Sequence, residues 1–192
     1  NLELIHAKDS TRLTDGKLIA TAYYYKLLSY MQRFAGMLGN KEDAAAFDAL
    51  AGNMKNAFQQ KFYDEKLKQY GNNTVTANLL PLYFGITPDS LKQTIAEKIR
   101  YKIHVENHGH TSAGLIGAQW QMRGLTELGY TDLAYVLASN TTYPSWGYMA
   151  ANGATTIWEL WNGNTADPGM NSQNHVMMLG DEFPFFDFET VW

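Results

Sequence analysis

The chain has 192 residues, of which 45% are hydrophobic and 14% aromatic, and its formal net charge is −4. That length is enough for one folded domain with a substantial core, and the composition excludes a largely disordered chain. The negative charge without a basic stripe argues against nucleic acid as a partner, and the absence of cysteine excludes disulfides and thiolate chemistry. No apolar run reaches the length of a membrane span, so we predict no membrane partner.

Apolar residues at helical spacing predict two long helices in the first third of the chain. The first covers residues 15–38 and ends at Gly39, a residue that favours the left-handed conformation of a helix C-terminus. Asn40 can cap the second helix, which covers residues 41–62 and has acidic side chains in its first turn. Because only Gly39 and Asn40 separate them, the two helices are predicted to form an antiparallel αα-hairpin.

More helices follow, joined by short turns and by a loop over residues 104–111 that contains glycine and histidine. They are predicted over residues 74–84, 88–101, 112–128 and 131–139. No run of residues alternates convincingly like a strand, so the predicted class is all-α, with hairpins arranged as a toroid or a bundle. The two most apolar helices, 74–84 and 112–128, are expected to form its inner layer.

The stretch from Tyr143 to His175, YPSWGYMAANGATTIWELWNGNTADPGMNSQNH, interrupts this helical pattern. Its glycines and prolines disfavour a core helix, and its asparagines and threonines favour caps and turns. The carboxylate of Glu159 stands among tryptophans, a setting that can shift a pKa and prepare a general acid or base. We predict a carbohydrate site built from loops, and weigh equally an ordinary surface glutamate between two inward-packing tryptophans.

Other residues of this stretch could bind a sugar. His175 could contact a substrate hydroxyl, although a histidine satisfied within a helix cap is the more common arrangement. Tyr143, Trp146 and Tyr148 could stack on sugar rings, or they could be packing residues at a helix start. A two-carboxylate hydrolase also needs a partner for Glu159, and the local candidates, which lack a comparable setting, are Asp167, Asp181 and Glu182.

The sequence gives little support to a metal site. His104, His108 and His110 form an H-x-E-x-H-x-H run with Glu106, but the run falls in a predicted loop without the spacing of zinc-binding helices. The segment 162–167 has some oxygen ligands of a calcium loop but lacks the closing glutamate. We therefore predict no metal and no cofactor.

Several blocks of the chain closely resemble the bacterial α-L-rhamnosidases of the inverting six-hairpin type. They are GATTIWELWNG (153–163), DPGMNSQNH (167–175), YPSWGYM (143–149), HTSAGLIG (110–117) and LTDGKLIATAYYY (13–25). The resemblance implies αα-hairpins forming about half of an (α/α)6 toroid, with residues 1–192 as the C-terminal portion of the catalytic domain. It implies Glu159 as the general base, His175 as a rhamnose contact, and Trp146 and Trp158 as pocket aromatics. Tyr143, from its aromatic ring alone, is a further substrate-binding candidate.

One motif of that family is not found: no segment matches the acidic motif, of the D-E-R-x-x-W kind, that carries the family's general acid. We therefore expect the acid upstream in the same polypeptide, and an isolated chain with little or no activity. The implied substrate is a rhamnose-containing oligosaccharide or glycoside, and the expected partners are the remainder of the polypeptide or further copies that cover exposed apolar inner helices. The alternatives are a non-catalytic helical module that binds a glycan or a protein, and a six-hairpin glycosidase acting on glucosyl or uronyl sugars.

Overall fold

The computed structural model describes residues 13–158 and Trp161, and these residues are mostly helical. The described residues belong to two compact parts, residues 13–99 and residues 100–158 with Trp161, which are treated separately below. The predicted all-α class is confirmed: each helix predicted between residues 15 and 139 is present, with shifts of a few residues at the ends. None of the helices among the described residues is both long enough and apolar enough to cross a membrane.

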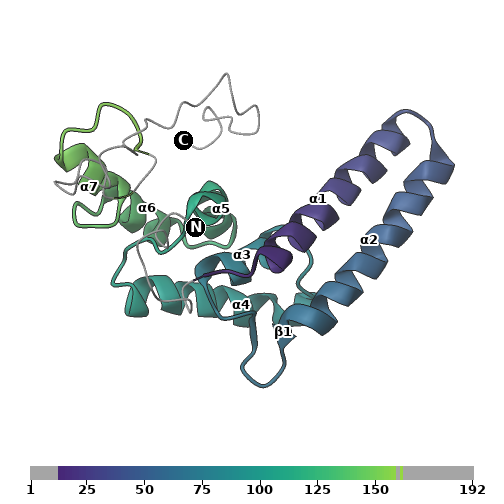
Figure 1. The fold of residues 1–192 in the computed structure, drawn as a ribbon, viewed down its shortest axis with the longest axis horizontal. Helices are drawn as coiled ribbons and strands as arrows, with labels where there is room; N and C mark the ends of the chain where they lie inside the picture. The colour runs from purple at the N-terminus through teal and green to yellow at the C-terminus, as the bar shows by residue number, and fades with distance from the viewer. Residues whose placement is uncertain (1–12, 159–160, 162–192) are drawn as a thin grey trace. The chain divides into compact units, whose positions relative to one another are not determined.

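The first part is built on a hairpin of two 22-residue helices, α1 (Gly16–Met37) and α2 (Lys41–Phe62), which lie side by side (Figure 1). The carboxylate of Asp15 accepts a hydrogen bond from the amide of Lys17 and caps α1. At the other end Gly39 takes a positive φ of 80°, and the amide of Asn40 donates to the carbonyl of Ala35. The short connection predicted from the sequence therefore has the expected left-handed glycine.

A small antiparallel ribbon that the sequence did not predict follows α2. Its strands, β1 (Tyr63–Asp64) and β2 (Gln69–Tyr70), have two residues each, and Tyr63 pairs with Tyr70. The ring of Tyr70 is fully buried and lies 5.7 Å from that of Phe58, centroid to centroid. Strands this short contain too few positions for an alternating pattern to appear in the sequence, and they leave the all-α class unchanged.

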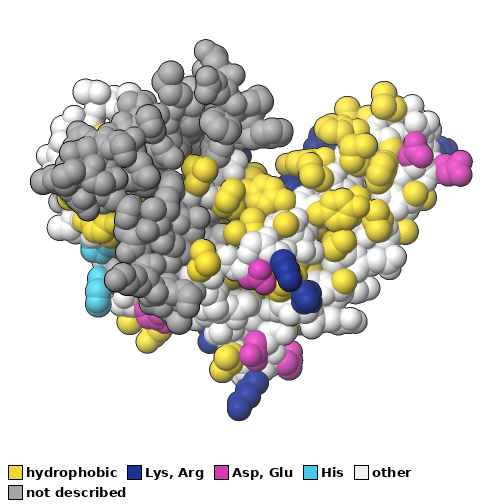
Figure 2. Space-filling view, in the orientation of Figure 1, with side chains coloured by type: hydrophobic (Ala, Val, Ile, Leu, Met, Phe, Trp, Pro, Cys, Tyr) yellow, Lys and Arg dark blue, Asp and Glu magenta, His cyan; other side chains and the backbone are white. Residues whose placement is uncertain are grey.

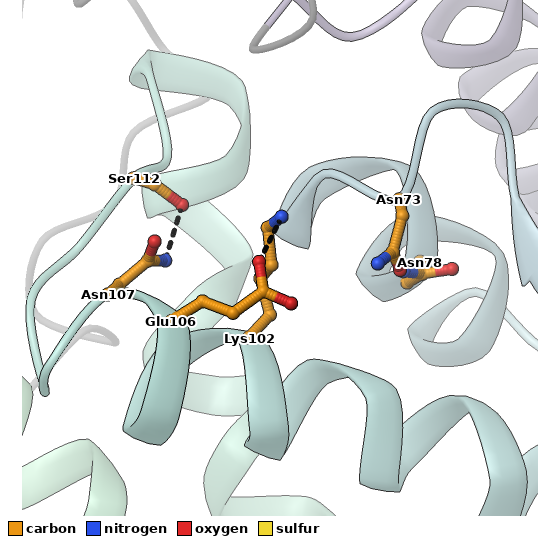
Figure 3. Close-up of polar contacts among 6 residues, drawn as sticks. All are labelled: Asn73, Asn78, Lys102, Glu106, Asn107 and Ser112. Atoms are coloured by element: carbon orange, nitrogen blue, oxygen red, sulfur yellow. Dashed lines mark hydrogen bonds and ion pairs between the residues drawn. The ribbon is translucent and has the colours of Figure 1, made fainter.

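Helix α3 (Val75–Tyr83) is the buried centre of the first part. The hydroxyl of Thr74 caps it by accepting from the amide of Ala77, and every residue from Val75 to Leu82 is buried. Inside it, the Asn78 side chain accepts from the amide of Tyr70 at 2.9 Å and donates to the Oδ1 atom of Asn73 at 2.8 Å (Figure 3). The helix expected over residues 74–84, apolar on most sides, is confirmed as a buried helix.

Most of the exposed large apolar side chains of the first part lie on α1 and its C-terminal end, and none lies on α3. Figure 2 shows hydrophobic side chains gathered over the α1–α2 hairpin. The exposed apolar side chains of α1 and its C-terminal end lie on one face of the helix: Tyr24, Leu27, Tyr30, Met31, Phe34, Met37 and Leu38. The expectation that the inner helices would be the exposed ones is therefore wrong for α3.

Helix α4 (Asp89–Tyr101) leads into the second part, where the helices are shorter. The π-helical turn η3 (Lys102–Glu106) continues α4 into the predicted loop, and an ion pair of 2.6 Å between Lys102 and Glu106 spans it (Figure 3). Helices α5 (Leu115–Glu127), α6 (Thr131–Ser139) and α7 (Trp146–Ala151) follow. Helix α7 was not predicted, because its six residues lie in a stretch whose glycines and prolines indicated a loop.

Candidate functional site

The loop from residue 107 to residue 114, between η3 and α5, has a fixed shape. His108 and Gly109 take positive φ angles of 51° and 75°, and the amide side chain of Asn107 donates to the hydroxyl of Ser112 at 2.9 Å (Figure 3). A β carbon built on Gly109 would lie 3.1 Å from a methyl group of Val136, so the loop backbone packs closely on α6. The loop is thus braced against α6.

His110 ties the same loop to the end of α6. Its Nδ1 atom lies 3.0 Å from the carbonyl of Asn107, and since a carbonyl only accepts, Nδ1 must carry a proton and donate. In the neutral ring Nε2 is then an acceptor, and the side-chain amide N–H of Asn140 donates to it at 3.1 Å. Both ring nitrogens are therefore engaged within the protein.

The histidine run that raised the question of a metal site does not gather around one point. Among residues 13–158 and Trp161, no group of three or more His, Asp or Glu side chains could hold a metal ion. His110, which has two engaged ring nitrogens, acts within this part of the structure as a brace between the loop and α6.

Beneath the loop lies a buried polar chain of contacts that the sequence did not reveal. The hydroxyl of Thr111, whose side chain is 2% exposed, donates to the Oε1 atom of Gln121 at 3.0 Å and accepts from the amide of Ala113 at 3.2 Å. Gln121 belongs to α5 and is 0% exposed. Its Nε2 group has no hydrogen-bond partner in the described part of the chain.

The start of α7 is fixed by Ser145, which is fully buried. The Ser145 hydroxyl accepts from the amide of Tyr148 at 2.9 Å, and its single proton is shared between the carbonyls of Asn140 and Thr142. This cap sets the direction of α7, whose first residue is Trp146. The rings of Tyr143 and Tyr148 meet edge to face, with centroids 5.5 Å apart, and Tyr143 remains 46% exposed.

Trp161 connects this helix to the loop. Its indole N–H donates to the carbonyl of Ala113 at 3.1 Å, and its ring meets that of Trp146 edge to face at a centroid distance of 4.9 Å. Trp161 is only 8% exposed. Trp161, which belongs to the stretch from Tyr143 to His175, is therefore held both by the loop and by α7.

The structure brings together some of the predicted site residues. Tyr143 and Trp146 lie at the start of α7, Trp146 contacts Trp161, and Trp158 is half-buried. Glu159 and His175 lie outside the described residues, as do the other carboxylates considered: Asp167, Asp181 and Glu182. Trp146 forms an aromatic pair with Trp161 at the start of α7, and its stacking on a sugar ring stays a prediction.

The known proteins similar to this chain match it over most of its length. The family model described as the bacterial alpha-L-rhamnosidase six-hairpin glycosidase domain matches residues 2–187. A curated alpha-L-rhamnosidase of Alteromonas sp. (strain LOR) is 37% identical over 168 residues, which is 84% of this chain and 18% of that protein. A curated alpha-L-rhamnosidase of Streptomyces avermitilis is 35% identical over 167 residues, 84% of this chain and 16% of that protein. The chain thus spans less than a fifth of the length of these relatives.

The solved structures similar to this chain are also those of alpha-L-rhamnosidases. A structure of an alpha-L-rhamnosidase from Dictyoglumus thermophilum matches 81% of this chain and 18% of its own, with 35% identity and a TM-score of 0.74. The structure of the Streptomyces avermitilis alpha-L-rhamnosidase complexed with L-rhamnose matches 85% of this chain and 16% of its own, with 34% identity and a TM-score of 0.75. Because the family model covers nearly the whole chain and these helical hairpins match, the chain belongs to the bacterial α-L-rhamnosidase six-hairpin glycosidase domain family.

Proposed function

We propose that this chain is the C-terminal portion of the catalytic domain of a glycoside hydrolase that removes terminal α-L-rhamnosyl residues with inversion. The observation that carries the proposal is the identity of 35–37%, over 84% of the chain, to proteins named alpha-L-rhamnosidase. A similar protein was solved in complex with L-rhamnose, which supports this sugar as the substrate unit. The substrate would be a rhamnose-containing oligosaccharide or glycoside.

In this proposal Glu159 is the general base. Its carboxylate removes a proton from a water molecule whose oxygen bonds to the anomeric carbon, on the face opposite the leaving group. As that bond forms, the glycosidic C–O bond breaks, and a second carboxyl group gives its proton to the leaving oxygen. The product sugar is the β-anomer, and the two carboxyl groups stand about 6.5–9.5 Å apart to leave room for the water.

The pocket around the base is proposed from the aromatic residues near it in sequence. Trp146 and Trp158 would form apolar walls for the sugar ring, Tyr143, with its exposed ring, would border them, and His175 would donate to or accept from a sugar hydroxyl. Apolar walls exclude water and strengthen the electrostatic effect of the base on the attacking water. The general acid is proposed to lie elsewhere in the same polypeptide, because no motif of that kind occurs in the 192 residues.

The proposal is tested by Glu159→Gln in the full-length enzyme, with a nitrophenyl α-L-rhamnoside as substrate. The amide cannot accept the proton, so kcat should fall by about 10²–10⁴-fold while rhamnose binding, measured by calorimetry, is retained. Glu42→Gln, which changes an exposed carboxylate in the first turn of α2, is the matched control and should keep the parent kcat. NMR should detect the β-anomer of rhamnose as the first product.

Four outcomes would each contradict part of the proposal. Parent-like turnover by Glu159→Gln would show that this residue is not the general base. Rapid hydrolysis of glucosides or uronides in a panel of nitrophenyl glycosides would show that the substrate unit is not rhamnose. Binding without hydrolysis of any glycoside would favour a non-catalytic module. The 192-residue chain alone should show little or no hydrolysis, and robust turnover by it would mean that the acid lies within these residues.

A further inference from the structure

We propose that Thr111, Gln121 and the indole N–H of Trp161 are positioning residues that hold in place the segment bearing Glu159. The proposal rests on the proposed function, because it assigns to these residues the alignment of the general base. None of them needs to touch the substrate. Their effect on the reaction would pass through the backbone between Trp158 and Trp161.

The first step of the argument is the anchor at Trp161. The indole N–H donates to the carbonyl of Ala113 at 3.1 Å, and the ring packs edge-on against Trp146 at 4.9 Å. Glu159 precedes Trp161 by two positions. Since consecutive Cα atoms are only about 3.8 Å apart, whatever fixes Trp161 restricts the paths open to the two residues before it.

The second step is what holds the acceptor. The carbonyl that receives the indole N–H belongs to Ala113, whose own amide donates to the hydroxyl of Thr111 at 3.2 Å. That hydroxyl donates in turn to Gln121 at 3.0 Å, on α5. Thr111, Ala113 and Gln121 are all buried, so these hydrogen bonds are not exchanged with water and confine the groups they join.

The third step is the brace on the other side of the loop. His110 donates to Asn107 and accepts from Asn140, and Gly109 packs against Val136. The loop is therefore fixed to α5 through Thr111 and to α6 through His110. A carbonyl held from both sides is a rigid acceptor for the indole N–H.

The fourth step is the reason for a polar network here. Gln121 keeps its Nε2 group buried without a hydrogen-bond partner in the described residues, so in this part of the chain the hydrogen bond of its side chain is the one to Thr111. Its Oε1 atom accepts the Thr111 proton, and this orients the Thr111 hydroxyl to accept from the amide of Ala113.

A general base acts only within hydrogen-bond distance of its water, and a displacement of about 1 Å can reduce the rate by about 10²-fold. Thr111→Val replaces the hydroxyl with a methyl group of similar size, and Trp161→Phe removes the indole N–H but keeps a ring against Trp146. In the full-length enzyme each should lower kcat by about 10–100-fold and leave KM for the nitrophenyl rhamnoside nearly unchanged. Thr111→Ser, which keeps the hydroxyl, should restore most of kcat.

Thr126→Val is the matched control, because the Thr126 hydroxyl lies on the same helix as Gln121 but is exposed and donates to the carbonyl of Met122. It should keep the parent kcat. The thermal midpoint is measured for each variant, so that a loss of kcat in a folded protein is separated from unfolding. If Thr111→Val does not fold, Trp161→Phe carries the test alone.

The proposal is overturned if Thr111→Val and Trp161→Phe both keep the parent kcat while Glu159→Gln is inactive, because the base then acts without these contacts. It is also overturned if KM rises and kcat is unchanged, since that result assigns the residues to substrate binding. Parent-like activity of Glu159→Gln is a different failure, because it removes the proposed base itself.

Discussion

Gly147 in α7 faces the carbonyl of Asn140 so closely that a β carbon built on it would lie deep inside van der Waals contact with that oxygen, and 2.9 Å from the carbonyl oxygen of Ser139. Both obstacles are backbone atoms at the end of α6, so neither can rotate away as a side chain would. The close contact between the end of α6 and the start of α7 thus depends on a missing side chain.

Gly147→Ala should therefore destabilise the protein by about 1–3 kcal/mol, because the methyl group forces α7 away from α6. Scanning calorimetry of the full-length protein measures the loss. Gly52→Ala is the control: this glycine lies inside α2 with nothing within 4 Å of the added carbon. There the gain in helix propensity should stabilise by about 0.5–1 kcal/mol. Equal effects of the two substitutions would contradict the steric argument.

Ser145→Ala should release the N-terminus of α7. The buried hydroxyl accepts from the amide of Tyr148 and donates to the carbonyl of Thr142, and loss of such a cap costs about 0.5–2 kcal/mol. Hydrogen exchange at the Tyr148 amide should accelerate accordingly. Asn40→Ala changes a cap residue of α2 whose side chain makes no capping hydrogen bond, and it should have a smaller effect. An unchanged exchange rate at Tyr148 would show that the cap adds nothing.

Asn78→Leu should destabilise the first part of the structure, residues 13–99. The leucine has a similar size but cannot accept the hydrogen bond from the buried amide of Tyr70, and an unsatisfied buried donor costs about 1–3 kcal/mol. Urea unfolding of the full-length protein measures the change. Asn56→Leu, on the exposed face of α2, should be nearly neutral, and a comparable loss there would contradict the role given to Asn78.

Tyr70→Phe should make stability less sensitive to alkaline pH. Burial of the phenol, the largest effect, raises the pKa of Tyr70 above its ordinary value near 10. Because the pKa is higher in the folded than in the unfolded state, the contribution of this group is complete below about pH 10 and is lost as the pH rises through the folded-state pKa. The free energy of unfolding, measured from about pH 8 to about pH 11, should fall less steeply in the variant. Tyr135→Phe, which alters a side chain that is 72% exposed, should leave the slope unchanged.

The prediction of helices succeeded where the signals are local. The glycine after α1 and the threonine before α3 occupy the cap positions that their residue types favour. Helix α7 was missed for a physical reason: a six-residue helix has little stability of its own, and the contacts that stabilise it come from Asn140 and Trp161. No local pattern encodes such contacts.

The residues of the candidate site likewise fall into those that the sequence could identify and those that it could not. The tryptophans, Glu159 and the histidine run could be named from residue types and from the resemblance of the quoted blocks. The network of Thr111 and Gln121 could not, because a threonine in a loop and a glutamine in a helix have no distinctive spacing. The only early signal was that Thr111 falls in a block, HTSAGLIG, quoted for its resemblance to the family.

The amino-acid sequence by itself determined the helical class, the first hairpin and the family, because helix periodicity, caps and motif blocks are read over short distances along the chain. Tertiary structure alone decided that Ala113 accepts the indole N–H of Trp161, a residue 48 positions later, and that Gln121 lies beneath the same loop. Hydrogen bonds and ring contacts depend on distances of a few ångströms in space, and these distances exist only once the helices have packed.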